Sequence, residues 1–458
     1  MIQKKLIFIC APVTSRSGYG AHARDLVSSL IEHNKYDIKI MDVPWGACPR
    51  NALDKSNKKD KKILDCIMPE PIQLERQPDV YIDIRIPNEF QQYGKFNIGI
   101  TAGVETTAVS GKWLEGCNKM DLVIVPSEHS KMGFINSVYD KIDNQSKQVV
   151  GELKLEKPME VLFEGANEDI YKPLNKDEID SEFFDMLNEK VPEKFAFLVV
   201  GQWCQGGYGE DRKDLSRTIK LFYESFANKK KQPALILKTS GATQSLIDRE
   251  ECLRKIKQVK SQFPLDWKLP NVYLLHGVLS DTEMNYLYNH PKVKAMVSFT
   301  HGEGFGRPLL EATMTGLSVI ASGWSGHLDF LNEYKSILVE GELQQVPNSV
   351  VWQDIIIPES KWFTVSETHC HNALNNFYEN FDNFKGRGKS LMSDNRDKFT
   401  LKHMTDEFDK ILSKYLKNSP QQVDLKLPKL KKVNNVELNE LPDIKLPKLK
   451  KVNEEVTS

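Results

Sequence analysis

The stretch 297-VSFTHGEGFGRPLLEATMTGLSVIASGWSGHLDF-330 decides the fold. A short apolar run ends in a glycine-rich turn, residues 301–306, and a helical pattern then begins at Arg307-Pro308 and stops at Gly316. Proline is tolerated in the first turn of a helix, and glycine is favoured just after a helix ends. A second apolar run, residues 317–320, and a second Gly/Ser turn follow. This order predicts a βαβ unit of a parallel sheet, with both turns at the carboxyl ends of strands.

Two glutamates flank the first turn. Glu303 lies in the turn and Glu311 lies in the helix, with seven residues between them. The backbone N–H groups of Gly304, Phe305 and Gly306 lie just after Glu303. Carboxylates accept hydrogen bonds from hydroxyls, and amides at a helix start donate to anions, so the pattern fits a polyhydroxylated ligand that carries phosphate. Taken alone, two glutamates at this spacing also fit a solvated pair that complements the helix dipole.

The same residues resemble a known family. Glu-Gly-Phe-Gly-x-Pro-x-Leu-Glu-Ala from Glu303, followed by Gly-x-x-Val-Ile-Ala-Ser from Gly316, resembles the signature of retaining glycosyltransferases of the GT-B fold, glycosyltransferase family 4. The resemblance extends over residues 1–418 and is most specific at this signature. It implies two facing Rossmann-like, doubly wound domains with a nucleotide-sugar cleft between them. It also implies hexosyl transfer from a nucleoside-diphosphate sugar to an acceptor hydroxyl, with retained anomeric configuration.

The rest of the chain repeats the alternation of strand and helix that predicts doubly wound parallel sheets. We expect an N-terminal, acceptor-side domain in residues 1–185 and a C-terminal, nucleotide-sugar-binding domain in residues 186–389. A C-terminal helical segment at about 390–418, with one long helix over residues 394–416, is expected to complete the first domain, as in the family. Residues 419–458 are expected to be a disordered tail.

The N-terminal domain starts with an apolar run, a turn with Gly18 and Gly20, and a helix. This arrangement presents backbone N–H groups to an anion. The match to a dinucleotide fingerprint is poor, because its third glycine would fall on Ala23. By resemblance, Gly18 and Gly20 contact the donor diphosphate, whereas the alternative is an ordinary βα turn.

The resemblance assigns roles to the residues of the second domain and its surroundings. Glu303 would hold the hydroxyls of the donor sugar beside the amides of Gly304, Phe305 and Gly306, and Glu311 would bind the ribose. The remaining assignments are Lys213 at the diphosphate, Leu279 and Asp281 at the base, and Glu105 at the transferred sugar.

This sequence departs from the family at two of these places. Family members usually have arginine directly after the strand-end glycine of the second domain, where this chain has Gln202, so Arg212 is expected to supply the missing charge beside Lys213. Glu105 stands where the family often has histidine. Local alternatives remain open. Lys213 could be a solvated residue at a helix start, Glu105 could be an ordinary loop carboxylate, and Asp281 lies in a capping box that starts at Ser280.

Composition limits the other functions. The 458 residues are 40% hydrophobic and 27% charged with a net charge of −1, which fits two globular domains and argues against a nucleic-acid partner. The seven cysteines are scattered without a C-x-x-C pair, so we expect a reducing compartment and neither a disulfide framework nor a zinc site. No metal or other cofactor is expected, and no apolar run approaches the roughly 18–20 residues of a spanning helix. We therefore expect a cytoplasmic protein, with peripheral membrane contact left open.

The C-terminal segment contains an internal repeat. Residues 424–434 recur almost unchanged as residues 443–453, and each copy carries a proline and a cluster of lysines. Two near-identical copies favour bivalent docking on a partner protein or an anionic surface. The alternative is a tail that only improves solubility.

Other activities are compatible with the same two-domain fold. A nucleotide-sugar epimerase is one, and a glycan phosphorylase is a second, although a phosphorylase should be a longer chain. A non-catalytic nucleotide-sugar-binding protein is a third, and retained binding without turnover would identify it.

Overall fold

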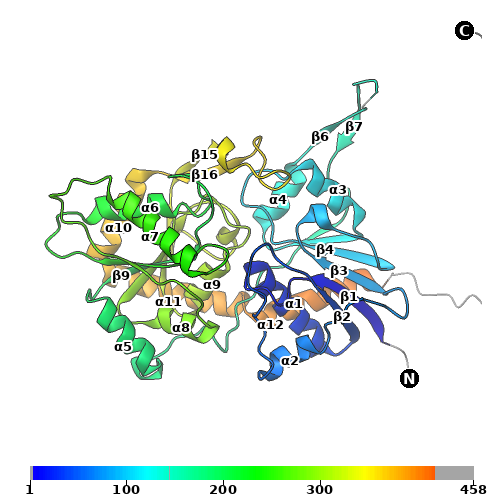
Figure 1. Ribbon diagram of the computed structural model, residues 1–458, viewed down its shortest axis with the longest axis horizontal. Helices are drawn as coiled ribbons and strands as arrows, with labels where there is room; N and C mark the ends of the chain where they lie inside the picture. Colours follow the sequence, from blue (N-terminus) through cyan, green and yellow to red (C-terminus); the bar gives the residue numbers. More distant parts are fainter. Residues whose placement is uncertain (1–3, 144, 418–458) are drawn as a thin grey trace, which may run out of the picture. The chain divides into compact units, whose positions relative to one another are not determined.

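The computed structural model describes residues 4–143 and 145–417. These residues belong to one compact unit, which is built on two parallel sheets of six strands each (Figure 1). The sheets confirm the two Rossmann-like halves predicted from the sequence. We call the half around the first sheet the N lobe and the half around the second sheet the C lobe. The repeats in residues 424–434 and 443–453 lie outside the described residues.

The N-lobe sheet has the order β2-β1-β3-β4-β5-β8. Its four inner strands are buried almost throughout, as in β1, where every residue after the first is buried. Continuous apolar runs are typical of parallel strands that are covered on both faces. Its strands are β1 (Lys5–Ala11), β2 (Tyr36–Asp42), β3 (Val80–Ile84), β4 (Phe96–Ile100), β5 (Leu122–Val125) and β8 (Met159–Val161).

The C-lobe sheet has the order β11-β10-β9-β12-β13-β14. Its strand order reverses between β9 and β12, and that of the N-lobe sheet reverses between β1 and β3. Ligands of open parallel sheets bind beyond the carboxyl ends of strands at such a reversal. The strands are β9 (Ala196–Gln202), β10 (Ala234–Ser240), β11 (Val272–Leu274), β12 (Val293–Ser298), β13 (Ser318–Ser322) and β14 (Ile337–Val339).

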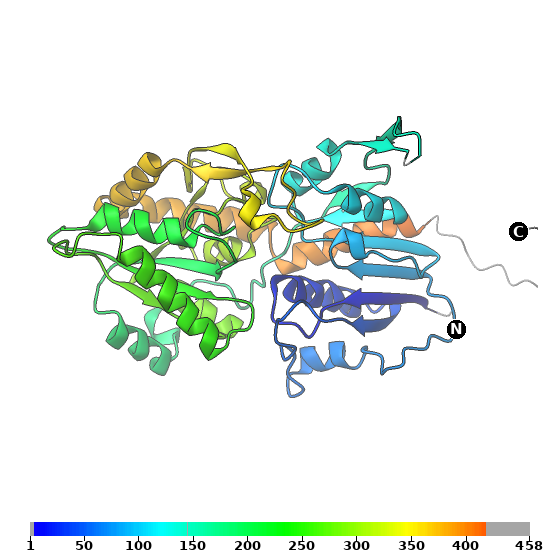
Figure 2. The same ribbon diagram turned by 45° about the horizontal axis from the view of Figure 1, so that its top comes forward.

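Helices cover both faces of each sheet, and Figure 2 shows the two lobes from a second direction. In the N lobe, α1 and α12 pack side by side on one face, and α3 and α4 pack on the other. The helices are α1 (Gly18–His33), α2 (Lys58–Leu64), α3 (Gly111–Lys119), α4 (Glu128–Asn136), α5 (Ser181–Lys190), α6 (Leu215–Phe226), α7 (Leu246–Lys260), α8 (Asp281–Asn289), α9 (Arg307–Met314), α10 (Glu367–Glu379), α11 (Phe381–Lys398) and α12 (Leu401–Leu416).

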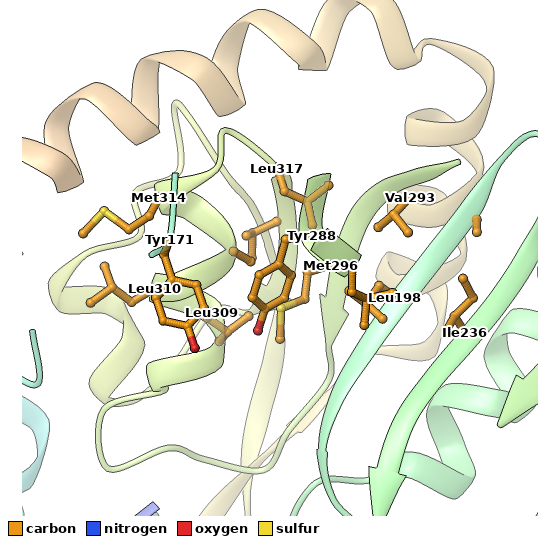
Figure 3. Close-up of a cluster of buried hydrophobic side chains, with 14 of the residues drawn as sticks. Tyr171, Leu198, Ile236, Tyr288, Val293, Met296, Leu309, Leu310, Met314 and Leu317 are labelled. Atoms are coloured by element: carbon orange, nitrogen blue, oxygen red, sulfur yellow. The ribbon is translucent and has the colours of Figure 1, made fainter. Parts of the chain in front are cut away.

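A large apolar cluster holds α8 and α9 against the C-lobe sheet (Figure 3). Leu309 and Leu310 of α9 are at most 1% exposed and lie over Met296 of β12 in the same cluster. Burying one such side chain stabilises the fold by about 1.5–3 kcal/mol. The helix that carries Glu311 is therefore fixed to the sheet by its apolar face.

Three features of the chain were not predicted. Two antiparallel hairpins form two-stranded sheets of their own, apart from the parallel sheets. They are β6–β7 (Tyr139–Ile142 and Val149–Leu153) and β15–β16 (Gly341–Gln345 and Lys361–Val365). The prediction of one helix over residues 394–416 was wrong, because α11 ends at Lys398 and a separate helix, α12, begins at Leu401. Thr400 caps α12 there by accepting a hydrogen bond from the His403 N–H, and Ala166 bonds to the backbone on either side of the break.

Candidate functional site

Two loops of the C lobe meet at the reversal of its sheet. The β9–α6 loop (residues 203–214) follows the central strand, and the β12–α9 turn (residues 299–306) follows the strand beside it. Every residue of the β12–α9 turn is buried. The glycines and charged residues predicted for the site in this lobe lie mainly in these two segments.

The β12–α9 turn packs directly against the N lobe. A Cβ atom on Gly302 would lie 2.0 Å from the Glu105 carbonyl oxygen, and one on Gly304 would lie 2.0 Å from the Ala102 carbonyl oxygen. Only glycine allows the two backbones to approach this closely. The Ser127 hydroxyl of the N lobe also donates to the Gly304 carbonyl oxygen at 2.5 Å.

Two ion pairs join the predicted charged residues. Lys213 pairs with Glu303 inside the C lobe, and Arg212 pairs with Glu105 of the N lobe at 2.6 Å. Glu303 is only 8% exposed. Burial alone would raise the pKa of Glu303, but Lys213 and Arg212 outweigh burial and hold that pKa below its usual value. Glu303 is therefore an ionised acceptor beside two cations.

The start of α9 leaves backbone donors without partners. Within the described residues, the N–H groups of Gly304, Phe305 and Gly306 make no hydrogen bond. Gly306 adopts a left-handed conformation (φ 96°), and no side chain caps the helix. Buried amides are nearly always paired, so these unpaired donors beside Glu303 indicate a place for ligand oxygens.

The other two helix starts near the site are capped. The Asp211 carboxylate accepts from the Leu215 N–H at the start of α6, at 3.2 Å. At the start of α1, the Ser17 hydroxyl accepts from the Gly20 N–H at 3.0 Å, so this predicted phosphate donor is already engaged. Gly18 is exposed, with open space around its Cα. Gly18 is therefore the accessible member of the predicted glycine pair.

Glu311 lies in a buried cluster between the lobes. Arg307 contacts Glu311 at 2.9 Å and Asp25 of the N lobe at 2.5 Å. The Tyr288 hydroxyl lies 3.4 Å from the same glutamate. Burial raises the pKa of Glu311 to about 7, against the opposing charge of Arg307, and burial raises the pKa of neighbouring Glu164 to about 7 as well. Both carboxylates thus titrate near neutral pH.

The predicted base-binding residues lie at the start of α8. Leu279 is half-buried and packs on the cluster shown in Figure 3, and Asp281 is exposed. The predicted capping box is confirmed, since Ser280 and Glu283 bond to each other's backbone N–H groups. The carboxylate of Asp281 is not needed as a cap and remains accessible.

The structure also shows contacts that the sequence did not predict. Gln202 ends β9 as an exposed residue, whereas Arg212 occupies the contact with the N lobe. Arg307 fills a variable position of the signature, and its partner Asp25 lies on α1 of the other lobe. His301 had no predicted role and is described below.

Among the described residues, no group of His, Cys, Asp or Glu side chains is arranged to hold a metal ion. Within residues 4–143 and 145–417, no helix has both the length and the apolar character that a bilayer crossing requires.

Comparison with solved structures identifies the class of fold. HepE of Anabaena, solved with UDP-glucose, aligns over 89% of this chain and 99% of HepE, with 13% identity and a TM-score of 0.54. Sucrose-phosphate synthase of Thermosynechococcus elongatus aligns over 90% and 99%, with 13% identity and a TM-score of 0.59. A glycosyltransferase of Rickettsia africae aligns over 92% and 100%, with 14% identity and a TM-score of 0.55.

The fold is GT-B, two Rossmann-like halves in one chain. At these sequence identities the similarity establishes the fold alone, and function has to be argued from the site. No protein-family profile matches the sequence. No curated protein sequence matches it either.

Proposed function

We propose that this protein is a retaining glycosyltransferase of the family 4 type, which moves a hexosyl unit from a nucleoside-diphosphate sugar to an acceptor hydroxyl. The observation that carries the proposal is the set of unpaired N–H groups at Gly304, Phe305 and Gly306, beside the Glu303–Lys213 pair. Donors for phosphate oxygens and an acceptor for sugar hydroxyls are thus adjacent at the reversal of the C-lobe sheet. The nucleotide-sugar ligand of HepE, which has the same fold, agrees with this choice of donor.

The reaction follows from the charges in the site. The bond between the anomeric carbon and the diphosphate oxygen breaks, and negative charge develops on the diphosphate. Lys213, Arg212 and the amides of the β12–α9 turn would stabilise that charge, with the Gly18 amide as the accessible N-lobe donor. Charge compensation comes from these groups, so we propose that no metal ion is needed.

The acceptor oxygen attacks the anomeric carbon on the same face of the sugar from which the diphosphate leaves. Its proton passes to the leaving phosphate, which leaves the transferred sugar with its original configuration. Glu303 holds sugar hydroxyls as an ionised acceptor and forms no covalent bond, unlike the nucleophile of a retaining glycosidase. Glu105, paired with Arg212, lies on the N-lobe side of the same region. Close contact between the lobes would limit attack by water.

The nucleoside half of the donor fits the neighbouring cluster. Glu311 would accept hydrogen bonds from the two ribose hydroxyls, with Arg307 keeping it oriented. Leu279 and Asp281, at the start of α8, would lie beside the base. The ionised form of Glu311 accepts two hydrogen bonds, whereas the protonated form accepts fewer.

The test is a panel of UDP-, GDP- and ADP-sugars, with release of free nucleoside diphosphate and donor binding measured on wild type and Glu303→Ala. Glu250→Ala is the matched control, since Glu250 is an exposed glutamate of the same lobe that pairs with Arg249. We expect turnover of one donor by wild type and by the control, and its loss in Glu303→Ala. Donor binding without turnover, even with candidate acceptors, would favour a binding protein over an enzyme. No binding of any donor would overturn the proposal.

A further inference from the structure

His301, in the β12–α9 turn, stacks on and hydrogen-bonds to strand β16. Its side chain is 1% exposed, and its ring stacks on Trp362 with centroids 4.1 Å apart and planes 5° apart. Ring Nδ1 lies 2.6 Å from the Phe363 carbonyl oxygen. The Phe363 N–H donates in return to the His301 carbonyl oxygen at 3.0 Å. Ring and backbone thus join the turn to this strand.

Strand β16 also contacts the N lobe next to the site. The Lys361 N–H donates to the Thr107 hydroxyl at 2.9 Å, and the Thr107 N–H donates to the Lys361 carbonyl oxygen at 2.8 Å. Thr107 lies two residues after Glu105, the N-lobe partner of Arg212. The β15–β16 hairpin therefore spans from the N lobe to His301.

His301 also contacts the β9–α6 loop, which carries Arg212 and Lys213. The His301 N–H donates to the Arg212 carbonyl oxygen at 3.0 Å. Ring Nε2 lies 3.1 Å from the Gly209 carbonyl oxygen in the same β9–α6 loop. One residue thus links β16, the β12–α9 turn and the β9–α6 loop.

The ring has a single proton to share between its two carbonyl neighbours. Burial lowers the pKa of His301 to about 4, so the ring is neutral near pH 7 and carries one N–H. The shorter contact assigns this proton to Nδ1, which donates to Phe363. The bond from the turn to β16 is therefore the one that the side chain supplies.

We propose that His301 is a positioning residue, which transmits the contact between the N lobe and β16 to the Arg212–Lys213 segment. The proposal rests on the proposed function only for its kinetic test. When Thr107 holds Lys361, the strand fixes His301, and His301 holds the backbone of Arg212 so that both cations face Glu105 and Glu303. Docking of the lobes and assembly of the charged groups thereby become one event.

Three variants of His301 separate positioning from filling of space. An Asn amide can donate from the place of Nδ1, whereas a Gln amide reaches the place of Nε2. We expect His301→Asn to stay within about fivefold of wild-type kcat, and His301→Gln and His301→Ala to lose about 100-fold, as a displacement of about 1 Å does. The donor KM should change much less than kcat. Equal activity of the Gln variant and wild type would overturn the proposal.

A double-variant cycle with Thr107 tests the transmission. Thr107→Ala removes the hydroxyl that accepts from Lys361, and we expect a kcat about tenfold lower. If the two residues act in one pathway, Thr107→Ala with His301→Ala is no slower than His301→Ala alone. If instead the loss of kcat in the double variant equals the product of the two single losses, the residues act independently, and the proposed transmission from Thr107 to His301 is overturned. His290→Ala is the control, because this C-lobe histidine is equally buried at 1% exposure and packs on Phe184.

A third measurement does not depend on turnover. Hydrogen exchange of residues 206–214 should be faster in His301→Ala than in wild type or His290→Ala, because the hydrogen bond from the turn to β16 is lost. Unchanged exchange would overturn the proposal even if the enzyme is active. Faster exchange in a protein that turns over no donor would contradict the proposed function and leave the positioning role standing.

Discussion

The turns before α1 and α9 look alike in sequence but differ in what they leave free. Each turn follows a strand at a reversal of its sheet. Gly18 and Gly20, which the sequence predicted in the first turn, lie inside α1, whereas the glycines of the C lobe lie in the turn itself. In the N lobe, the Ser17 hydroxyl takes the Gly20 N–H. In the C lobe, the amides of Gly304, Phe305 and Gly306 have no partner within the described residues. Whether a glycine turn can bind an anion therefore depends on the residue before the helix.

The difference separates stability from function. A capped helix start stabilises a helix by about 1 kcal/mol. A buried group without a partner costs about 1–3 kcal/mol, and such groups are retained where a ligand satisfies them. The N-lobe turn therefore serves mainly the fold, and the C-lobe turn gives up stability to keep donors available. Four experiments, taken from the largest expected effect to the smallest, test this division.

The largest effect is expected at Lys213, which faces the C-lobe turn. Lys213→Met removes the cation beside Glu303 and should lower kcat by about 100- to 1,000-fold, as loss of one transition-state donor does. Steady-state turnover of the donor is the measurement. Lys255→Met is the control, because Lys255 lies over the Trp203 ring and donates to Cys204 without contacting Glu303. Full activity of Lys213→Met would place the diphosphate elsewhere.

The sequence predicted those parts of the site that depend on neighbouring residues, and missed those that depend on contacts between distant segments. The β12–α9 turn, α9 and β13 were predicted because local signals agree there: apolar strands, a glycine turn, proline at the helix start and Gly316 after its end. The roles of His301 and Arg307 could not be predicted, because their partners Phe363 and Asp25 come from distant segments.

The two hairpins and the break between α11 and α12 were not predicted, for a different reason. Strand β15 is exposed at all five positions and so lacks the alternation that marks a half-buried strand. The break between α11 and α12 depends on Thr400 and on its pairing with Ala166, whereas the apolar pattern runs on past it. The hairpins and the break both depend on pairing with distant residues. The fold class does not, because the repeated alternation of strand and helix already indicates it.

The second prediction concerns Glu311, which we propose binds the ribose of the donor. Its pKa is raised to about 7, so its ionised fraction increases as pH rises through 7. We expect the donor KM at pH 6 to be about tenfold higher than at pH 8, because the ionised fraction of a carboxyl group with a pKa of about 7 increases about tenfold between these pH values. Glu311→Gln should abolish this dependence, which KM measured between pH 6 and 8 will show.

The matched variant for this prediction is Glu164→Gln, because burial raises the pKa of Glu164 to about 7 too. It should keep the pH dependence of the donor KM. If the dependence disappears in Glu164→Gln and persists in Glu311→Gln, the ribose site has been assigned to the wrong carboxylate. Both glutamates bind protons more tightly in the folded state, so their contribution to stability decreases as pH rises from about 4.5 through 7.

The third prediction measures how much the N lobe contributes. The side chains of Arg212 and Glu105 are 25% and 30% exposed, and a pair of this kind is worth about 0.2–1 kcal/mol. A double-variant cycle of Arg212→Gln and Glu105→Gln on kcat/KM should therefore give a coupling between about 1.4-fold and about fivefold. A coupling above about 100-fold would make the N-lobe carboxylate as important as Lys213 and would weaken the division between the lobes.

The smallest effect on activity is expected at Ser17, which caps α1. Ser17→Ala should lower the free energy of unfolding by about 1 kcal/mol, measured by urea denaturation, because the Gly20 N–H loses its acceptor. The donor KM should change less than twofold, since we propose that the C-lobe turn makes most of the contacts with the donor. Thr400→Ala is the control, because it removes an equivalent cap from α12, which packs beside α1. If Ser17→Ala changes KM fivefold or more while Thr400→Ala does not, the α1 turn also contacts the diphosphate. Anion binding would then be shared by both lobes, with the capped amide exchanging between Ser17 and the ligand.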